Sequence, residues 1–239
     1  MEQVDGAKWK AFSLTFVAYK EGDWLGQVLA VSSLAPLVIL VSVGTLILFR
    51  RDLHTIFLCI GQLCNELLNL LIKRWVAEVR PAVPGVPNAH YGKYGFPSNH
   101  AQFVWFFCAY MSLFLFIRLK SGHVGYKCLL LWKIAFSLFL LIGAIAISYG
   151  RVYLNQHTWT QVCWGGIIGC ALGVLWFLVV HFGFTPFFHT MAAWPICEYL
   201  MIRDFSLIPN VLYYEYRCTR SEAFARNRKL SLQRNRQKS

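Results

Sequence analysis

Long apolar segments are the feature of this sequence that most limits its fold. A helix needs roughly 20 apolar residues to cross the hydrocarbon layer of a bilayer, because every backbone N–H and C=O must then bond within the segment. Of the 239 residues, 57% are hydrophobic and only 14% are charged, which is typical of a membrane bundle. The sequence therefore predicts an all-α, multispan transmembrane helical bundle with about five spans, at Leu25–Phe49, Leu53–Ile72, Ala101–Ile117, Cys128–Ile147 and Val162–Phe182.

A sixth apolar stretch, Phe184–Leu200, is interrupted by two prolines, His189 and Glu198. These interruptions predict an interfacial or re-entrant segment rather than a further crossing. We divide the chain into a polar N-terminal segment (1–24), a transmembrane domain (25–200) and a basic tail (201–239). The N-terminal segment lacks the compact apolar core of a cleavable signal peptide, so Leu25–Phe49 is expected to remain as an anchor.

Lys and Arg are divided unequally between the two sides that five crossings define. One side, with the N-terminal segment and the loops 73–100 and 148–161, carries eight of these residues; the other carries fourteen, nine of them after Met201. The positive-inside rule therefore predicts a cytosolic tail and places both loops on the non-cytosolic side.

The net charge of +12 is concentrated in the tail, where anionic membrane lipid is the nearest partner. The segment Ala223–Ser239 has neither interleaved aromatic residues nor a recognisable module, which argues against nucleic-acid binding. Six of the eight cysteines lie in or beside the apolar spans and none forms a CxxC pair, so we expect small buried side chains rather than disulfides. No cluster of His, Cys and carboxylate residues has zinc spacing, so no metal site is expected.

Gly165, Gly169 and Gly173 recur every four residues in the last predicted span. This spacing exposes a groove of bare backbone along one helical face, which allows a second helix to approach closely. We interpret these glycines as packing residues rather than as part of a reactive site.

Lys73 and Arg80-Pro81 lie where the second predicted span leaves the hydrocarbon. Their separation of seven residues is almost two helical turns, so the two cations would share a face if the helix continued to Pro81, which ends it about there. Two cations on one face can bind one phosphate. They can equally be ordinary interfacial cations at the end of a helix.

The segment Gly92–His100 lies directly before the third predicted span. Ser98 or Asn99 can cap that helix, whose first N–H groups and partial positive charge favour a phosphoryl oxygen. His100, in the first turn, could donate a proton to a leaving oxygen. A capping serine next to an unrelated histidine is the alternative interpretation.

His157 and Gln161 are four residues apart at the start of the last predicted span, and so share a helical face. The amide oxygen of Gln161 can accept a hydrogen bond from one imidazole nitrogen, which leaves the other as a nucleophile. Arg151 offers a planar guanidinium suited to phosphate. A single loop histidine is often only a polar surface residue. Two spans separate this segment from the other two motifs, however, so all three motifs are expected on the same side of the membrane.

The motifs resemble the three-part signature of the phosphatidic-acid-phosphatase type 2 superfamily, K-x6-RP, PSGH and SR-x5-H-x3-D. The chain departs from it at Asn99, where the family usually has Gly, at the two residues between Ser148 and Arg151, and at Gln161, where the Asp stands. Longer stretches resemble the branch of this superfamily that acts on dolichyl diphosphate, including KYGFPSNHAQFVWFF, RVYLNQHTWTQV and AAWPICEYLMIRDFSLIPN. That branch also has Gln after HTW.

The resemblance implies a helical bundle of this superfamily's type and a phosphatase that uses no metal and no cofactor. Its substrate would be a polyisoprenyl (dolichyl) diphosphate, hydrolysed on the lumenal side of the endoplasmic reticulum membrane. His157 would attack phosphorus to form a phosphohistidine, and His100 would protonate the leaving oxygen. Gln161 would orient His157. The expected phosphate-binding residues are Lys73, Arg80, Ser98, Asn99 and Arg151.

Two alternative functions stay open. The enzyme could act on another lipid phosphate, such as a sphingoid-base phosphate or phosphatidate, or the chain could be a lipid transporter or scramblase. A third alternative, an inactive scaffold, is disfavoured because both histidines and all three phosphate-binding cations survive. Glu66, an acid well inside a span, could assist His157 or could bond a neighbouring helix through Asn65 or Lys73.

Overall fold

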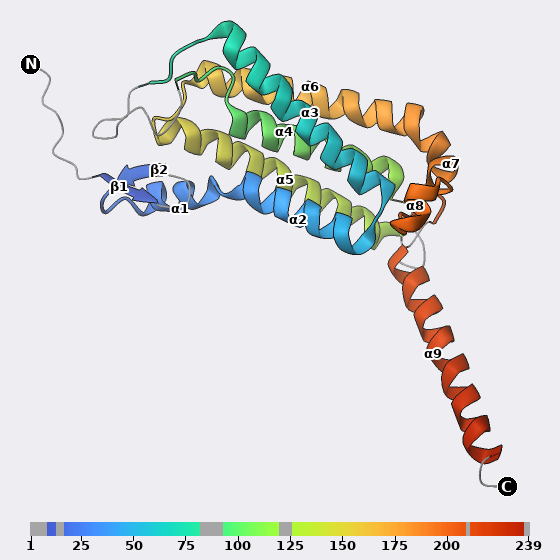
Figure 1. Cartoon of the computed structure of the whole chain (residues 1–239). Helices are drawn as coiled ribbons and strands as arrows, with labels where there is room; N and C mark the ends of the chain where they lie inside the picture. The colour runs from blue at the N-terminus through green and yellow to red at the C-terminus, as the bar shows by residue number, and fades with distance from the viewer. Residues whose placement is uncertain (1–8, 13–16, 82–92, 120–125, 209–210, 237–239) are drawn as a thin grey trace, which may run out of the picture.

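The structure, a computed structural model, describes residues 9–12, 17–81, 93–119, 126–208 and 211–236. Within these residues, five helical segments are long and apolar enough to cross a membrane, and they lie side by side in one bundle (Figure 1). The predicted multispan helical fold is confirmed. The five segments are Trp24–Arg50, Leu53–Val76, Asn99–Arg118, Lys127–Tyr153 and Trp159–Ala192.

The first span consists of two helices, α1 (Trp24–Ser32) and α2 (Ala35–Arg50). They are separated at Ser33 and Leu34, and a proline occupies the first turn of α2, where its missing N–H and fixed φ are tolerated. The next span is α3 (Leu53–Val76), which is capped by Asp52 through the Thr55 N–H at 3.1 Å.

The third and fourth spans are α4 (Asn99–Leu113), which continues as the π-helical turn η2 (Phe114–Arg118), and α5 (Tyr126–Tyr153). The last span begins as α6 (Trp159–Leu178) and runs on through η3 (Val179–Phe184), the 3-10 turn η4 (Thr185–Phe187) and α7 (Phe188–Ala192). The rest of the sixth apolar stretch forms the short helix α8 (Pro195–Tyr199), so this stretch is not a separate crossing.

A small antiparallel hairpin precedes the bundle, formed by β1 (Trp9–Phe12) and β2 (Val17–Lys20). The sequence predicted only a polar segment here. Val17 is buried and packs with Leu29 of α1 and Leu154, so the hairpin covers one end of the bundle. All eight cysteines are free, but of the six in or beside the spans only Cys108 is buried within the protein, so the expectation of buried cysteines is met only in part.

The three glycines of α6 lie directly against the backbone of α4. A Cβ atom at Gly169 would lie 2.2 Å from the carbonyl oxygen of Gln102, and the glycines one turn before and after would make similarly short contacts of 2.8 and 2.6 Å with α4 carbonyls. The predicted packing role is confirmed, and α4 and α6 can approach closely because these positions have no side chain.

Helix α3 is joined to α4 by a buried polar cluster. Asn69 donates a 2.7 Å hydrogen bond to the side-chain oxygen of Gln102, whose amide nitrogen donates to Asn65 at 2.9 Å. All three side chains are buried. Because a polar group in this setting stabilises the fold only when it is paired, the cluster fixes the register of α3 on α4.

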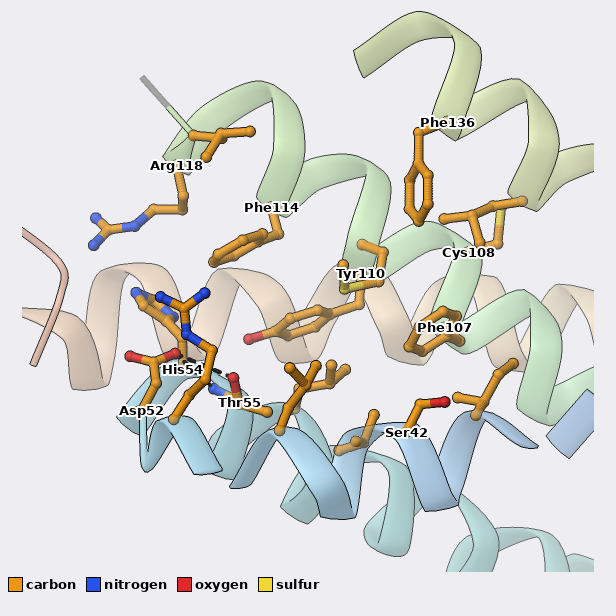
Figure 2. Close-up of a pocket in the computed structure, with 18 of the residues that line it drawn as sticks. Ser42, Asp52, His54, Thr55, Phe107, Cys108, Tyr110, Phe114, Arg118 and Phe136 are labelled. Carbon is orange, nitrogen blue, oxygen red and sulfur yellow. Dashed lines mark hydrogen bonds between the residues drawn. The ribbon is translucent and has the colours of Figure 1, made fainter. Parts of the chain in front are cut away.

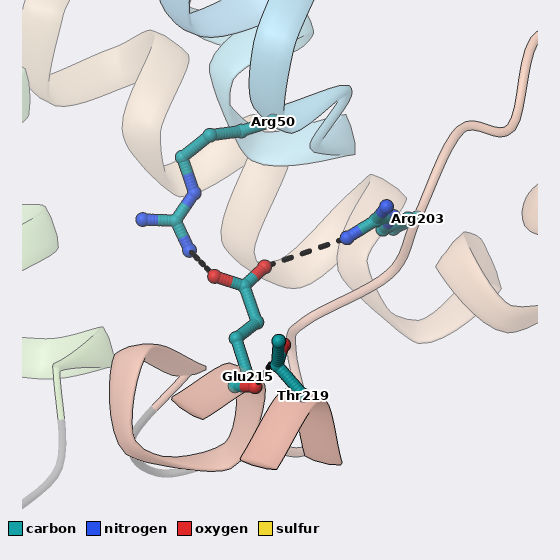
Figure 3. Close-up of polar contacts among 4 residues, drawn as sticks. All are labelled: Arg50, Arg203, Glu215 and Thr219. Atoms are coloured by element: carbon teal, nitrogen blue, oxygen red, sulfur yellow. Dashed lines mark hydrogen bonds and ion pairs between the residues drawn. The ribbon is translucent and has the colours of Figure 1, made fainter. Parts of the chain in front are cut away.

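The tail forms one long helix, α9 (Val211–Arg236), which projects away from the bundle (Figure 1). It is held at its first turns by Glu215, which lies 3.5 Å from the Arg50 guanidinium and 3.4 Å from that of Arg203 (Figure 3). The tail therefore begins at the end of the bundle where α2 ends and α3 begins.

Gly169→Ala tests the close approach of α4 and α6. The added methyl group meets backbone rather than a movable side chain, so we expect a loss of about 1–3 kcal/mol in the free energy of unfolding. Gly143→Ala on α5 is the matched control, because nothing lies within 4 Å of its Cβ position. Unfolding of both variants in detergent would measure this, and equal stability of the two would contradict the packing.

Candidate active site

Arg80 lies in the segment after α3, beside the residues that precede α4: the Gly95 N–H donates to the Glu78 carbonyl at 2.8 Å, and Val79 pairs with Tyr94. Helix α3 ends at Val76, followed by Ala77 in the left-handed conformation with φ 52°, so the helix does not continue to Arg80. The prediction that Lys73 and Arg80 could share one helical face is therefore wrong. Arg80 is instead held by the other end of the loop, where its Nε donates to the Tyr94 carbonyl at 3.1 Å.

Lys73 reaches from α3 to the first residue of α4. Its ammonium group donates a hydrogen bond to the side-chain oxygen of Asn99, whose amide nitrogen donates to Glu66 at 3.4 Å. Asn99 therefore bonds Lys73 directly, and its expected contact with phosphate stays a prediction. Glu66 therefore bonds a neighbouring helix, as one of the two alternatives proposed for it expected, but its partner is Asn99 rather than Asn65 or Lys73.

The start of α4 presents backbone donors. Hydrogen bonding within the helix begins with the Gln102 N–H to the Ser98 carbonyl, which leaves the N–H groups of residues 99–101 without a helical partner. The Ser98 N–H donates instead to the Gln161 carbonyl at 3.0 Å, so that amide is not available to a substrate. The Ser98 hydroxyl is fully buried and has no hydrogen-bond partner among the residues that the structure describes.

His157 lies in the tight turn between α5 and α6. The N–H groups of Gln156 and His157 both donate to the Arg151 carbonyl, at 3.0 and 3.2 Å, which folds the chain back over the last turn of α5. Thr158 then caps α6 by accepting from the Gln161 N–H at 3.3 Å. The side chains of Arg151 and His157 are both buried.

Gln161 lies between His157 and an acid that the sequence analysis missed. Its side-chain oxygen is 3.0 Å from Nδ1 of His157, and its amide nitrogen donates to Glu78 at 2.7 Å. Because the amide oxygen accepts, Nδ1 carries the proton and Nε2 keeps its lone pair, as predicted for the nucleophile. The sequence offered one indication of Glu78, because it lies two residues before Arg80, within the motif that runs from Lys73 to Pro81.

Burial lowers the pKa of His157 well below its ordinary value, and the charges of Arg80, Arg151 and Lys73 lower it further. The same three cations act electrostatically on His100. The two histidines and the three cations therefore occupy one end of the bundle, where His157 is held as a neutral imidazole.

His100 is anchored by the break in the first span. Its Nε2 lies 3.1 Å from the Ser33 carbonyl oxygen. A carbonyl can only accept, so Nε2 is the donor there, and Nδ1 is the nitrogen left to exchange a proton with a substrate. The sequence gave no indication of this contact, because Ser33 lies in a different apolar span.

These groups together suit a phosphoryl group. A neutral imidazole with a free lone pair, three cations, the first turn of a helix and a hydroxyl with no partner among the described residues lie at this end of the bundle, and each of the last three can bind anionic oxygen. Among the described residues, no group of three His, Cys, Asp or Glu side chains is placed to hold a metal ion.

Several known proteins are similar to this chain in sequence. The profile of the PAP2 superfamily matches residues 54–184, a range that contains Lys73, Arg80, His100 and His157. "Dolichyldiphosphatase 1" of Rhinolophus ferrumequinum is 48% identical over 225 residues, covering 94% of each chain. "Lipid phosphate phosphatase gamma" of Arabidopsis thaliana is 36% identical, covering 87% of this chain and 89% of its own.

One solved structure has a similar fold. It is the crystal structure of a transmembrane PAP2 type phosphatidylglycerolphosphate phosphatase from Bacillus subtilis, with a TM-score of 0.51 and 23% sequence identity. The match covers 73% of this chain and 81% of that one. It supports the bundle architecture described above.

Gln161→Ala removes the acceptor that fixes the His157 tautomer, so we expect kcat to fall roughly 10- to 100-fold, as when a hydrogen-bonded orienting group is lost. Glu78→Ala should lower kcat by less, because Gln161 keeps its bond to His157. Glu78→Gln still offers an oxygen to Gln161, so near-normal kcat is expected. Steady-state phosphate release measures all three, and inactivity of Glu78→Gln would mean that its charge is required.

Folding stability should depend on pH through His157. Its pKa is lowered in the folded chain, so below about pH 6.5 the unfolded chain binds a proton that the folded chain does not, and stability falls with pH by at most about 1.4 kcal/mol per unit. The difference in unfolding free energy between wild type and His157→Gln, measured from pH 7.5 to 5.5, should therefore shift in favour of the variant. A constant difference would contradict a neutral buried imidazole.

Proposed function

Because the chain belongs to the PAP2 superfamily, a family of phosphatases, we propose that it hydrolyses dolichyl diphosphate to dolichyl phosphate and inorganic phosphate. The observation that carries this proposal is the pairing of Nδ1 of His157 with the Gln161 amide oxygen at 3.0 Å, which leaves the lone pair on Nε2 of an imidazole that Lys73, Arg80 and Arg151 influence electrostatically. Such a pairing activates a nucleophile without a metal ion.

In the first step, Nε2 of His157 attacks the terminal phosphorus. The bond from phosphorus to the bridging oxygen breaks, and its electron pair stays on the departing dolichyl phosphate. His100 enters this step as an imidazolium, a form that the negative charge of the bound diphosphate favours; it gives its Nδ1 proton to that oxygen and keeps its Nε2 proton on the Ser33 carbonyl. Lys73, Arg80 and Arg151, with the amides at the start of α4, hold the equatorial oxygens. Charge spreads over these oxygens in the transition state, so fixed cations supply the stabilisation that Mg²⁺ supplies elsewhere.

In the second step, water attacks the phosphorus of the phosphohistidine. His100, now neutral at Nδ1, accepts a proton from this water, the bond to Nε2 breaks, and phosphate leaves with His157 restored to its neutral form. One residue thus acts as acid and then as base. The Ser33 carbonyl keeps the same face of the His100 ring toward the substrate in both steps.

The position of the site favours a lipid substrate. The histidines lie at the ends of membrane-spanning helices, so a diphosphate headgroup can reach them while its hydrocarbon remains in the bilayer. Relatives named dolichyldiphosphatase 1, from Rhinolophus ferrumequinum and Dictyostelium discoideum, are 48% and 38% identical to this chain, which favours a polyisoprenyl diphosphate. We place the enzyme in the endoplasmic reticulum membrane with its site lumenal and its tail cytosolic, where it would recycle the lipid carrier of protein N-glycosylation.

A second candidate substrate class is a lipid phosphate monoester. The observation that favours it is the 36% identity to a plant lipid phosphate phosphatase over 87% of the chain. Both substrate classes would use the same histidines and cations, so a comparison of substrates distinguishes them.

Phosphate release by the purified protein should be at least about tenfold faster, in kcat/KM, with dolichyl diphosphate than with dolichyl phosphate or phosphatidate. His157→Ala should release no phosphate from any of them, because no other side chain replaces its lone pair. Assays in EDTA should give the same rates. Preference for phosphatidate would support the second substrate class, and activity that requires Mg²⁺ would contradict the mechanism.

A further inference from the structure

A cavity of about 950 Å³ lies between α2, α4 and α5, and neither His100 nor His157 lines it. We call it the α2–α4–α5 cavity. Its lining is mostly apolar and includes both Ala35 and Arg50, the first and last residues of α2. At 1.5 Å per residue the cavity therefore extends over about 22 Å, which is most of the thickness of a bilayer's hydrocarbon layer.

The end of this cavity farthest from the histidines is polar (Figure 2). Asp52, His54, Thr55, Tyr110 and Arg118 line it, and the hydroxyl of Tyr110 points toward the others. Arg118 is the last residue of the third span, which begins at Asn99. The twenty residues of this span place Arg118 about 30 Å from the start of α4. None of these five residues takes part in the mechanism proposed above.

Several buried polar atoms at this end have no partner among the described residues. They are the Tyr110 hydroxyl, both ring nitrogens of His54 and one carboxylate oxygen of Asp52. Tyr110 is 1% exposed and His54 is 7% exposed, so bulk water does not solvate them freely. An unsatisfied buried polar group costs about 1–3 kcal/mol, so these groups indicate a ligand that is polar at this point.

The chemistry at this end is dominated by donors. The Arg118 guanidinium only donates, and its hydrogen bond to the Ser206 carbonyl is long, at 3.5 Å. Tyr110 and His54 can each donate one more bond. One oxygen of Asp52 is already occupied, because it accepts from the Thr55 N–H at 3.1 Å and from the Thr55 hydroxyl at 3.2 Å. Donors of this kind around an arginine match the oxygens of a phosphate.

We propose that the α2–α4–α5 cavity binds an anionic phospholipid, with its phosphate against Arg118, His54 and Tyr110 and one acyl chain along the apolar part. The apolar lining and the donor-rich end correspond to the two halves of one amphiphile. The bound lipid would satisfy the buried donors and fill the space between α2 and α5. This proposal does not depend on the substrate of the histidine site.

Native mass spectrometry of the full-length protein with phosphatidylglycerol tests the proposal. This lipid is a phosphodiester, so a phosphatase for terminal phosphates does not consume it. We expect one tightly retained phosphatidylglycerol per chain. Diacylglycerol with the same chains lacks the phosphate, and inorganic phosphate lacks the chains, so neither should be retained comparably. Equal retention of diacylglycerol would overturn the proposal.

Two pairs of variants locate the lipid. Arg118→Gln should weaken retention by about tenfold, the loss of one charge-assisted bond, whereas Arg228→Gln on the exposed tail should not. Ser42→Phe should block the acyl chain. Thr45→Phe is its control, because both hydroxyls bond their own helix at 2.7 and 2.8 Å but only Ser42 lines the cavity.

Unchanged retention in both Arg118→Gln and Ser42→Phe would overturn the proposal. Thermal unfolding of each variant, compared with its control, separates loss of the site from loss of the fold. Phosphate release from dolichyl diphosphate is measured in parallel with lipid retention. If the protein retains the lipid at this cavity but releases no phosphate, this inference stands and the proposed function is refuted. If it releases phosphate but retains no lipid, the proposed function stands and this inference is refuted.

Discussion

The close contact between α4 and α6 is the interaction on which the reactive end of this protein depends. Three glycines bring the helix backbones together, and at the end of this seam the Ser98 N–H bonds the Gln161 carbonyl. The first turn of one helix therefore lies beside the residue that orients His157. A wider spacing would separate the helix start from the imidazole, because the two come from segments about sixty residues apart.

The electrostatics of the site follow from placing three cations around a group that must stay neutral. Lys73, Arg80 and Arg151 repel one another, and their mutual repulsion is offset when a multiply charged phosphate enters. Burial is the main reason that the pKa of His157 is lowered, and the charges of these cations lower it further. A site of this kind is preorganised for an anion, since its charges are already in place when negative charge develops.

Most of the fold and of the site could be predicted from the sequence, because both depend on local patterns. Span lengths predicted five crossings, the Gly repeat predicted a close helix contact without indicating the partner helix, and a four-residue spacing predicted the bond between His157 and Gln161. The contacts with Glu78 and Ser33 could not be predicted, since each depends on where a loop or helix break comes to lie in space. The end of α3 at Val76 was missed because nothing in the local sequence marks Ala77 as left-handed.

The hydrogen bond between His100 and Ser33 gives the first span a part in the chemistry, although none of the motif residues lies there. The carbonyl belongs to the tight turn between α1 and α2, where the Ser33 and Leu34 N–H groups bond the carbonyls three residues back, and a helix can bend at such an interruption. A change in the tilt of the first span, for example in a bilayer of different thickness, would rotate this carbonyl and with it the imidazole ring. Membrane thickness could in this way influence the rate of proton transfer.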